Sequence, residues 1–218
     1  MTNTLNSPKV RAVLERLFEG AAHDDENGPE LPAGAWVTAS AQELADACQG
    51  SYMPISEPGG RLLYALTRAS RPGAVVEFGT SFGISTAYLA AAVADNGAGH
   101  LFSTELSPVK VAAAQANLED AGLADVVTIL PGDARETLAA VGGPVGLVFL
   151  DGWKDLCLPV LRLLEPALAP GALVVADDVD SHASMGDYLA YVRAPGNGYV
   201  SIGFPVEDGM EVSCWTGA

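Results

Sequence analysis

The chain has 218 residues, with 11 Lys and Arg against 27 Asp and Glu, a net charge of −16, and hydrophobic residues make up 49% of it. This length suits one domain that buries about 70% of the surface of its unfolded chain, and the composition excludes a disordered protein. The acidic balance argues against nucleic acid and anionic membranes as partners, because both attract basic surfaces.

The cysteine pattern and the N-terminus bear on the compartment. Cys48, Cys157 and Cys214 lie far apart and show no CxxC or Cys/His ligand spacing, so neither a disulfide framework nor a zinc site is expected. The first ten residues lack the features of a signal peptide, and no apolar run is long enough to span a membrane. We therefore expect a cytoplasmic protein with no membrane partner.

Residues 1–60 are expected to form a helical cap within one domain that comprises residues 1–218. Ser40, followed three positions later by Glu43, is the pattern of a capping box, and apolar residues recur at helical spacing before it. Helices are expected over residues 8–19 and 41–49, and an exposed loop over the acidic, breaker-rich residues 23–30.

Residues 61–218 are expected to form the core, in which strands alternate with helices. The predicted strands cover residues 74–78, 100–104, 126–130, 146–150, 172–176, 199–203 and 210–215. The predicted helices cover residues 62–69, 84–94, 108–121, 135–141, 156–168 and 184–193. Such alternation indicates an α/β fold with a Rossmann-like, doubly wound sheet of about seven strands, mostly parallel. The last two strands have no helix between them, so an antiparallel C-terminal hairpin is expected.

In such a sheet the ligand lies at the carboxyl ends of the strands, and the first strand ends at a glycine loop. Gly79 and Gly83 have the spacing G-x-x-x-G, which differs from the G-x-G-x-x-G of dinucleotide-binding folds. Glu77, just before this loop, would repel a pyrophosphate but suits the ammonium group of an amino-acid moiety. This favours S-adenosylmethionine over a nicotinamide dinucleotide.

Acidic residues also follow the next two strands. Glu105 is placed to accept hydrogen bonds from ribose hydroxyls, and Asp133 from an adenine amino group. Alternatively, Glu105 stabilises a helix N-terminus and Asp133 is the N-cap of the following helix. Acidic residues at three consecutive strand ends together favour a nucleoside cofactor.

Three carboxylates, Asp151, Asp177 and Asp178, follow the fourth and fifth strands. Neighbouring strand ends would crowd them, and a hard divalent cation such as Mg²⁺ would relieve their repulsion. The alternative is that Asp177 and Asp178 cap a helix or are solvated. Lys154 would have a lowered pKa beside such a cation and could then act as a general base. Trp153 offers a flat face to adenine or to an aromatic substrate, or else it simply packs.

Residues 53–194 resemble the class I S-adenosylmethionine-dependent O-methyltransferases, and most closely the catechol O-methyltransferase type. The most telling segment is Leu150-Asp151-Gly152-Trp153-Lys154-Asp155, which is similar to the metal-and-base segment of that family, with Gly where catechol enzymes carry His. Ala176-Asp177-Asp178-Val179 resembles the Ala-Asp-Asn-Val of the family. Asp178 therefore departs from the usual Asn and adds a negative charge.

The resemblance implies a role for each matching residue. Lys154 would be the general base, and Asp151, Asp177 and Asp178 would bind Mg²⁺ or another divalent cation. The cofactor-binding residues would be Met53, Ile55, Glu77, Gly79, Ser81, Ser85, Glu105, Asp133, Ala134 and Trp153.

The resemblance also implies an enzyme that methylates a hydroxyl of a small molecule, aromatic or a vicinal diol. Catechol enzymes use a late glutamate to hold the second hydroxyl, and neither Glu207 nor Glu211 aligns cleanly with it. Two alternatives remain open: a metal-independent methyltransferase with His182 as base, and a non-catalytic module that binds S-adenosylmethionine. A homodimer is compatible with the sequence and is not required by it.

Overall fold

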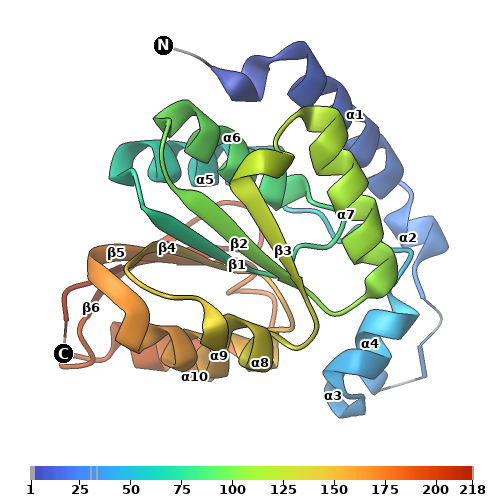
Figure 1. The fold of residues 1–218 in the computed structure, drawn as a ribbon. Coiled ribbons are helices and arrows are strands. Elements are labelled where there is room, and N and C mark those ends of the chain that lie inside the picture. The colour runs from blue at the N-terminus through green and yellow to red at the C-terminus, as the bar shows by residue number, and fades with distance from the viewer. Residues whose placement is uncertain (1–2, 30, 33, 218) are drawn as a thin grey trace.

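The computed structural model describes residues 3–29, 31–32 and 34–217, and within them one seven-stranded sheet organises the chain (Figure 1). The strand order is β3-β2-β1-β4-β5-β7-β6. Strands β1 to β5 pair in parallel, whereas β7 runs antiparallel to both of its neighbours. The strands are β1 (Ala74–Phe78), β2 (His100–Glu105), β3 (Val127–Pro131), β4 (Val145–Leu150), β5 (Leu168–Ala176), β6 (Tyr199–Phe204) and β7 (Met210–Trp215). The predicted Rossmann-like fold with a C-terminal hairpin is thereby confirmed.

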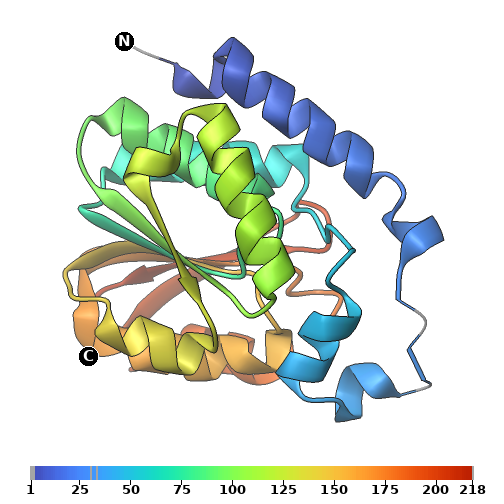
Figure 2. The same cartoon turned by 45° about the vertical axis from the view of Figure 1, so that its right-hand side comes forward.

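Helices cover both faces of the sheet (Figures 1 and 2). One face carries α1 (Pro8–Ala21), α5 (Glu57–Ser70), α6 (Ile84–Asn96) and α7 (Pro108–Ala121). The other carries α8 (Ala134–Thr137), α9 (Cys157–Leu164) and α10 (Met185–Arg193). Short 3₁₀ turns are η1 (Thr4–Asn6), η2 (Ala124–Val126), η3 (Leu138–Ala140), η4 (Lys154–Leu156) and η5 (Glu165–Ala167). Each face buries its own apolar cluster, which is why the central strands are apolar on both sides.

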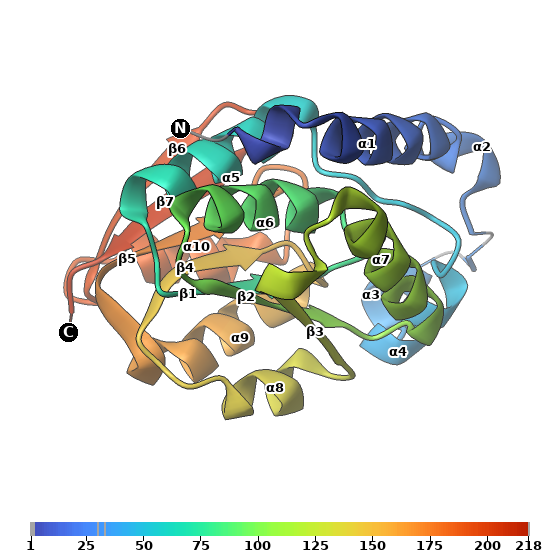
Figure 3. The same ribbon diagram turned by 45° about the horizontal axis from the view of Figure 1, so that its top comes forward.

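Three short N-terminal helices lie outside both layers; the first follows the end of α1, and the other two lie beside the end of α7 (Figure 3). They are α2 (Asp24–Asn27), α3 (Ala35–Thr38) and α4 (Ala41–Ala47). The capping box of α4 is present, because the Ser40 hydroxyl accepts from the Glu43 backbone N–H and the Glu43 carboxylate accepts from the Ser40 backbone N–H. Along the described part of the chain, no helix is both long and apolar enough to cross a membrane.

The loop prediction for residues 23–30 is wrong for its first part. Asp24 begins a single helical turn, and its carboxylate accepts hydrogen bonds from the backbone N–H groups of Tyr52 at 2.9 Å and Met53 at 2.7 Å. The acidic composition of this segment therefore has a structural use, which is to hold the chain that leads into the core. Helix α3 was not predicted at all.

Two other boundaries differ from the prediction for identifiable reasons. Helix α5 begins at Glu57, five residues earlier than expected, because Ser56 caps it by accepting from the Gly59 N–H at 3.1 Å. Strand β5 begins at Leu168, so Pro170 and the glycine after it lie within the strand and not in a turn before it. The pairing of β5 with β4 shifts register near its start, and such an irregularity tolerates a proline that cannot donate a hydrogen bond.

Candidate active site

A cavity of about 490 Å³ lies between the carboxyl ends of the strands and helices α3 and α4. Its size is in the range of small-molecule and cofactor sites. Most of the residues expected to form the site line it: Met53, Ile55, Gly79, Ser81, Ser85, Glu105, Ala134, Asp151, Trp153, Lys154 and Asp178. Glu77, Asp133 and Asp177 do not line it. The structure thus brings eleven of the fourteen predicted site residues to one cavity.

The glycine loop after β1 forms the floor of this cavity. Gly79 has φ +105°, and a Cβ there would lie 2.8 Å from the backbone nitrogen of Gly152, in the loop after β4. Only glycine permits both this backbone conformation and this close approach. Gly83 precedes α6 as its N-cap and provides no side-chain acceptor, so the first N–H groups of α6 are open to a ligand.

Glu77 lies behind this loop as a fully buried carboxylate. Its oxygens accept hydrogen bonds from the hydroxyls of Ser85 and Thr86, both at 2.6 Å, and of Ser103 at 2.5 Å. Burial raises the pKa of Glu77 to about 7, against the opposing effect of these three donors. Because Glu77 does not reach the cavity, it can act on a cofactor only by orienting Ser85, which does line it.

Glu105 lines the cavity and also ties two loops together. Its carboxylate accepts from the backbone N–H groups of Ser81 and Ser107, both at 2.8 Å, and the Ser81 hydroxyl donates to the Tyr52 carbonyl at 2.7 Å. A carboxylate has about four acceptor sites, so ribose hydroxyls could still donate to it.

Asp133 takes the N-cap role that the sequence left open. Its carboxylate accepts from the Arg135 backbone N–H at 2.8 Å and pairs with the Arg135 guanidinium, whose hydrogen bonds lower the pKa of Asp133. The neighbouring residue, Ala134, lies on the cavity wall.

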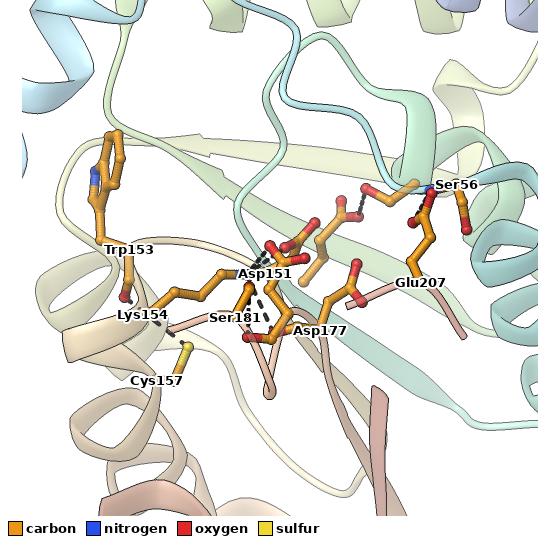
Figure 4. Close-up of polar contacts among 11 residues, drawn as sticks. Ser56, Asp151, Trp153, Lys154, Cys157, Asp177, Ser181 and Glu207 are labelled. Carbon is orange, nitrogen blue, oxygen red and sulfur yellow. Dashed lines mark hydrogen bonds and ion pairs between the residues drawn. The ribbon is translucent and has the colours of Figure 1, made fainter. Parts of the chain in front are cut away.

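Lys154 lies between the two predicted metal ligands that line the cavity, Asp151 and Asp178, and Figure 4 shows its side chain directed toward Asp151. Its Nζ lies 2.7 Å from Oδ1 of Asp151 and 3.0 Å from Oδ2 of Asp178, and it donates to the Asp177 carbonyl at 3.3 Å. The Lys154 side chain is only 10% exposed and that of Asp151 15%. Strand ends β4 and β5 are hydrogen-bonded neighbours, which is why residues 151 and 177–178 meet.

Burial and the proximity of the three acids shift the pKa values of Asp151 and Asp177. Burial, followed by the charges of Asp151 and Asp178, raises the pKa of Asp177 to about 8. Burial also raises the pKa of Asp151. Although burial alone would lower the pKa of Lys154, the adjacent carboxylates of Asp151 and Asp178 reverse this effect, and the pKa is raised. The sequence-based prediction of a lowered pKa for Lys154 assumed a divalent cation beside it. In this structure the partners of Lys154 are two carboxylates, and they stabilise its charged form.

The donor set has the right chemistry for a hard cation, but the side chains are not arranged around one. Among the described residues, no three His, Cys, Asp or Glu side chains form a group that could hold a metal ion. The Lys154 ammonium takes the place between Asp151 and Asp178 instead. The oxygen ligands that three carboxyl groups on adjacent strand ends can supply are the kind that Mg²⁺ prefers.

The two late glutamates differ in where they lie. Glu211 is fully buried and held by the Arg193 guanidinium at 2.6 and 2.8 Å, so it is not available to a ligand. Glu207 is exposed, accepts from the Ser56 backbone N–H at 3.0 Å, and raises the pKa of Asp151 by its charge (Figure 4).

Trp36, Phe82 and Lys110 are among the cavity-wall residues that sequence reasoning missed. Trp36 is 53% exposed, and its ring centroid lies 6.5 Å from that of Trp153. No pattern marks Trp36, because it sits on a four-residue helix. A signal for Lys110 did exist, since a cation in the first turn of a helix is unfavourable and therefore unusual.

Comparison with known proteins agrees with this geometry. Residues 76–179 match a methyltransferase domain family. The chain is 32% identical over 175 residues to a catechol O-methyltransferase of Mycobacterium tuberculosis, covering 80% of this chain and 73% of that protein. It is 33% identical over 148 residues to the mouse catechol O-methyltransferase, covering 65% of this chain and 55% of the mouse protein.

A solved structure is similar over nearly the whole chain. The O-methyltransferase TomG of Streptomyces achromogenes, involved in tomaymycin synthesis and crystallised with S-adenosylmethionine, has a TM-score of 0.62 at 23% identity. The match covers 94% of this chain and 99% of that one. At this identity the likeness concerns the fold.

Proposed function

Since this chain belongs to the class I S-adenosylmethionine-dependent O-methyltransferases, the family of the catechol O-methyltransferases, we propose that it methylates a hydroxyl of a small aromatic or vicinal-diol acceptor with the help of Mg²⁺ or another divalent cation. The family accounts for the methyl donor and for transfer to oxygen. The acceptor class, the metal and the residue roles are the proposal. Its main support is the meeting of Lys154, Asp151 and Asp178 in one cavity with the glycine loop.

In this proposal the glycine-loop side of the cavity holds the methionine moiety of the cofactor. Gly79, Ser81 and Ser85 line that side, and Glu77 orients Ser85 from behind. Met53 and Ile55 close over the cofactor from the N-terminal segment.

Glu105 would accept from the ribose hydroxyls, and Ala134 and Trp153 would contact the adenine. All three line the cavity, whereas Asp133 does not and has its own partner in Arg135. We therefore assign to Asp133 the positioning of Ala134 at the start of α8 and no contact with the cofactor.

Asp151, Asp177 and Asp178 would hold the divalent cation. When bound, Mg²⁺ supplies Lewis-acid stabilisation of a deprotonated hydroxyl. The crowding of the three acids supports this assignment, because the charges of Asp151 and Asp178 add to the effect of burial in raising the pKa of Asp177 to about 8. A cation among the acids would compete with the Lys154 ammonium for Asp151 and Asp178.

Lys154 would accept the proton of the acceptor hydroxyl at Nζ. It can do so only when its own pKa is reduced, and loss of its two carboxylate partners to a cation is the change that reduces it. Proton transfer of this kind contributes about 10²–10⁴-fold to a rate. Holding the oxygen in line with the methyl group and sulfur provides a further large share.

An exposed aromatic side chain at the cavity supports an aromatic acceptor. Trp36 is 53% exposed although it is apolar, lines the cavity, and has no role in the proposed cofactor site. A flat acceptor ring would cover the Trp36 side chain on binding.

The test is methyl transfer from S-adenosylmethionine to catechol, and the assay measures the S-adenosylhomocysteine that this transfer releases. We expect wild-type activity to be abolished by EDTA and restored by excess Mg²⁺. Lys154→Met and Asp151→Asn should each lose at least about 100-fold in kcat. Asp187→Asn, an exposed acid on α10, is the matched control and should keep wild-type activity.

Full turnover in EDTA together with an active Asp151→Asn variant would exclude the metal. His182 lines the same cavity, so a metal-independent reaction has a candidate base there. Activity that survives EDTA and is lost in His182→Ala would favour that second mechanism.

A further inference from the structure

Lys110 is a buried cation of the cavity wall that the proposed reaction does not use. It lies in the first turn of α7, is 6% exposed, and lines the cavity. Its Nζ lies 5.6 Å from the centroid of the Phe82 ring. Among the residues that the structure describes, none offers the ammonium an acceptor at hydrogen-bonding or ion-pair distance.

The carboxylates nearest to Lys110 are engaged elsewhere. Glu105 and Asp24 attract the ammonium through space, but neither carboxylate lies within ion-pair distance of it, and both are held by backbone N–H groups. They compensate part of the charge without pairing with it. The ammonium therefore keeps its donors free for a ligand.

The position is costly for a lysine without a ligand. Burial lowers the pKa of Lys110, and the positive end of the α7 dipole disfavours a cation in the first turn. A contact with one aromatic face compensates only about 0.5–2 kcal/mol. A methionine would fill the same space at no electrostatic cost, so a structural role alone does not account for the amine.

The charges around Lys110 favour a ligand with a single negative charge over a dianion. A phosphate dianion would meet one ammonium and two nearby carboxylates, Glu105 and Asp24. A carboxylate, with a single charge and two acceptor oxygens, suits one ammonium better. The Phe82 ring lies against the ammonium and the Cys48 thiol is close to it, and neither side chain is a second cation that would favour a dianion.

We propose that Lys110 is an anion-recognition residue of this cavity and that its ammonium binds a carboxylate of a ligand held there. The inference rests on the proposed function and deepens it. The carboxylate has two sources, the amino-acid end of the cofactor or an acidic substituent on the acceptor, and the two arms of the test separate them.

The first arm measures cofactor affinity by calorimetry in wild type, Lys110→Met and Lys9→Met, an exposed lysine substituted in the same way. The ligands are S-adenosylhomocysteine and its decarboxylated analogue. If the cofactor is the source, Lys110→Met should weaken S-adenosylhomocysteine about tenfold or more and change the analogue less than threefold, since a hydrogen bond to a charged group is lost. Lys9→Met should change neither.

The second arm measures KM for 3,4-dihydroxybenzoate and for its neutral methyl ester. If the acceptor is the source, Lys110→Met should raise KM for the acid about tenfold and leave the ester unchanged, and Lys110→Arg should retain the preference for the acid. Thermal melts of each variant show whether it is folded, and Lys110→Gln replaces Lys110→Met if the latter is not.

If Lys110→Met weakens only the acidic ligand of one pair, the inference is supported, and that pair identifies whether the carboxylate belongs to the cofactor or to the acceptor. Equal changes for both members of each pair, or no change in either, would overturn it, because a structural lysine does not discriminate between acid and neutral ligands. Failure of wild type to bind S-adenosylhomocysteine would instead remove the proposed function, and this inference with it.

Discussion

At the scale of single residues, Glu77 has the most informative environment. It was expected next to the cofactor, and it lies one layer further in, where three hydroxyls hold it and burial raises its pKa to about 7. Glu77 does lie at the carboxyl end of β1, as the sequence predicts. The direction of its side chain, however, depends on which face of β1 packs against the helices. Alternation along one strand does not reveal that choice when both faces are buried.

The buried carboxyl should make stability depend on pH. The folded pKa of about 7 exceeds the ordinary value of 4.5, so the folded state binds more protons than the unfolded state between these values. The contribution of Glu77 is fully favourable below about pH 4.5 and is lost as the pH rises through about 7, a change of about 3 kcal/mol.

Glu77→Gln should abolish this dependence. We expect urea denaturation to show that the variant gains stability relative to wild type, by up to about 3 kcal/mol, as the pH is raised from 4.5 to 8. The altered hydrogen bonds of the amide add an offset that does not vary with pH. A difference between the two proteins that stays constant over this range would contradict the assignment.

At the scale of elements, helix α5 shows why some boundaries could not be predicted. Pro58-Gly59-Gly60 has the composition of a turn, yet all three residues are helical. Gly60 is needed because a Cβ there would lie 2.4 Å from the ring of Tyr88, on α6. The reason for a glycine at position 60 is thus a contact between two helices, which helix propensity along the chain does not predict.

This contact predicts opposite effects for two similar substitutions. Gly→Ala in a helix usually stabilises by up to about 1 kcal/mol. Gly60→Ala should instead lower the free energy of unfolding by about 1–3 kcal/mol, because the buried Tyr88 ring must move.

Gly186→Ala on α10 is the matched control for this prediction. A Cβ at Gly186 meets nothing within 4 Å, so this variant should be neutral or slightly stabilised. Chemical denaturation of both variants measures the effect. Similar changes at the two sites would show that helix propensity, and not the contact with Tyr88, decides.

At the scale of the whole molecule, the cavity forms only where distant segments meet. Its walls come from the cap, from the loops after β1, β2 and β4, and from the segment after β5. A ligand bound among them would contact all of these segments at once. Binding should therefore stabilise the entire fold.

S-adenosylhomocysteine at about 100 times its Kd should add about 2.7 kcal/mol to the free energy of unfolding. For a chain of this size that corresponds to a rise in Tm of about 5–10 °C, measured by differential scanning fluorimetry. NAD at the same concentration is the control and should produce no rise. A shift with NAD alone would restore the nicotinamide alternative that the glycine spacing disfavoured.

The sequence by itself determined the order of strands and helices, the C-terminal hairpin and the strand ends that line the cavity. These follow from hydrophobic periodicity and from short motifs, which are local properties of the chain. It also singled out Lys154, Asp151 and Asp178, because adjacent parallel strands bring their carboxyl ends together.

Only the tertiary structure decided which side chains face the cavity and which partners they have. It turned Glu77 inward, paired Asp133 with Arg135, placed the Lys154 ammonium between two acids, and brought Lys110 to the cavity wall over the Phe82 ring. Direction, burial and pairing depend on contacts between segments far apart in the chain, and no local pattern encodes them.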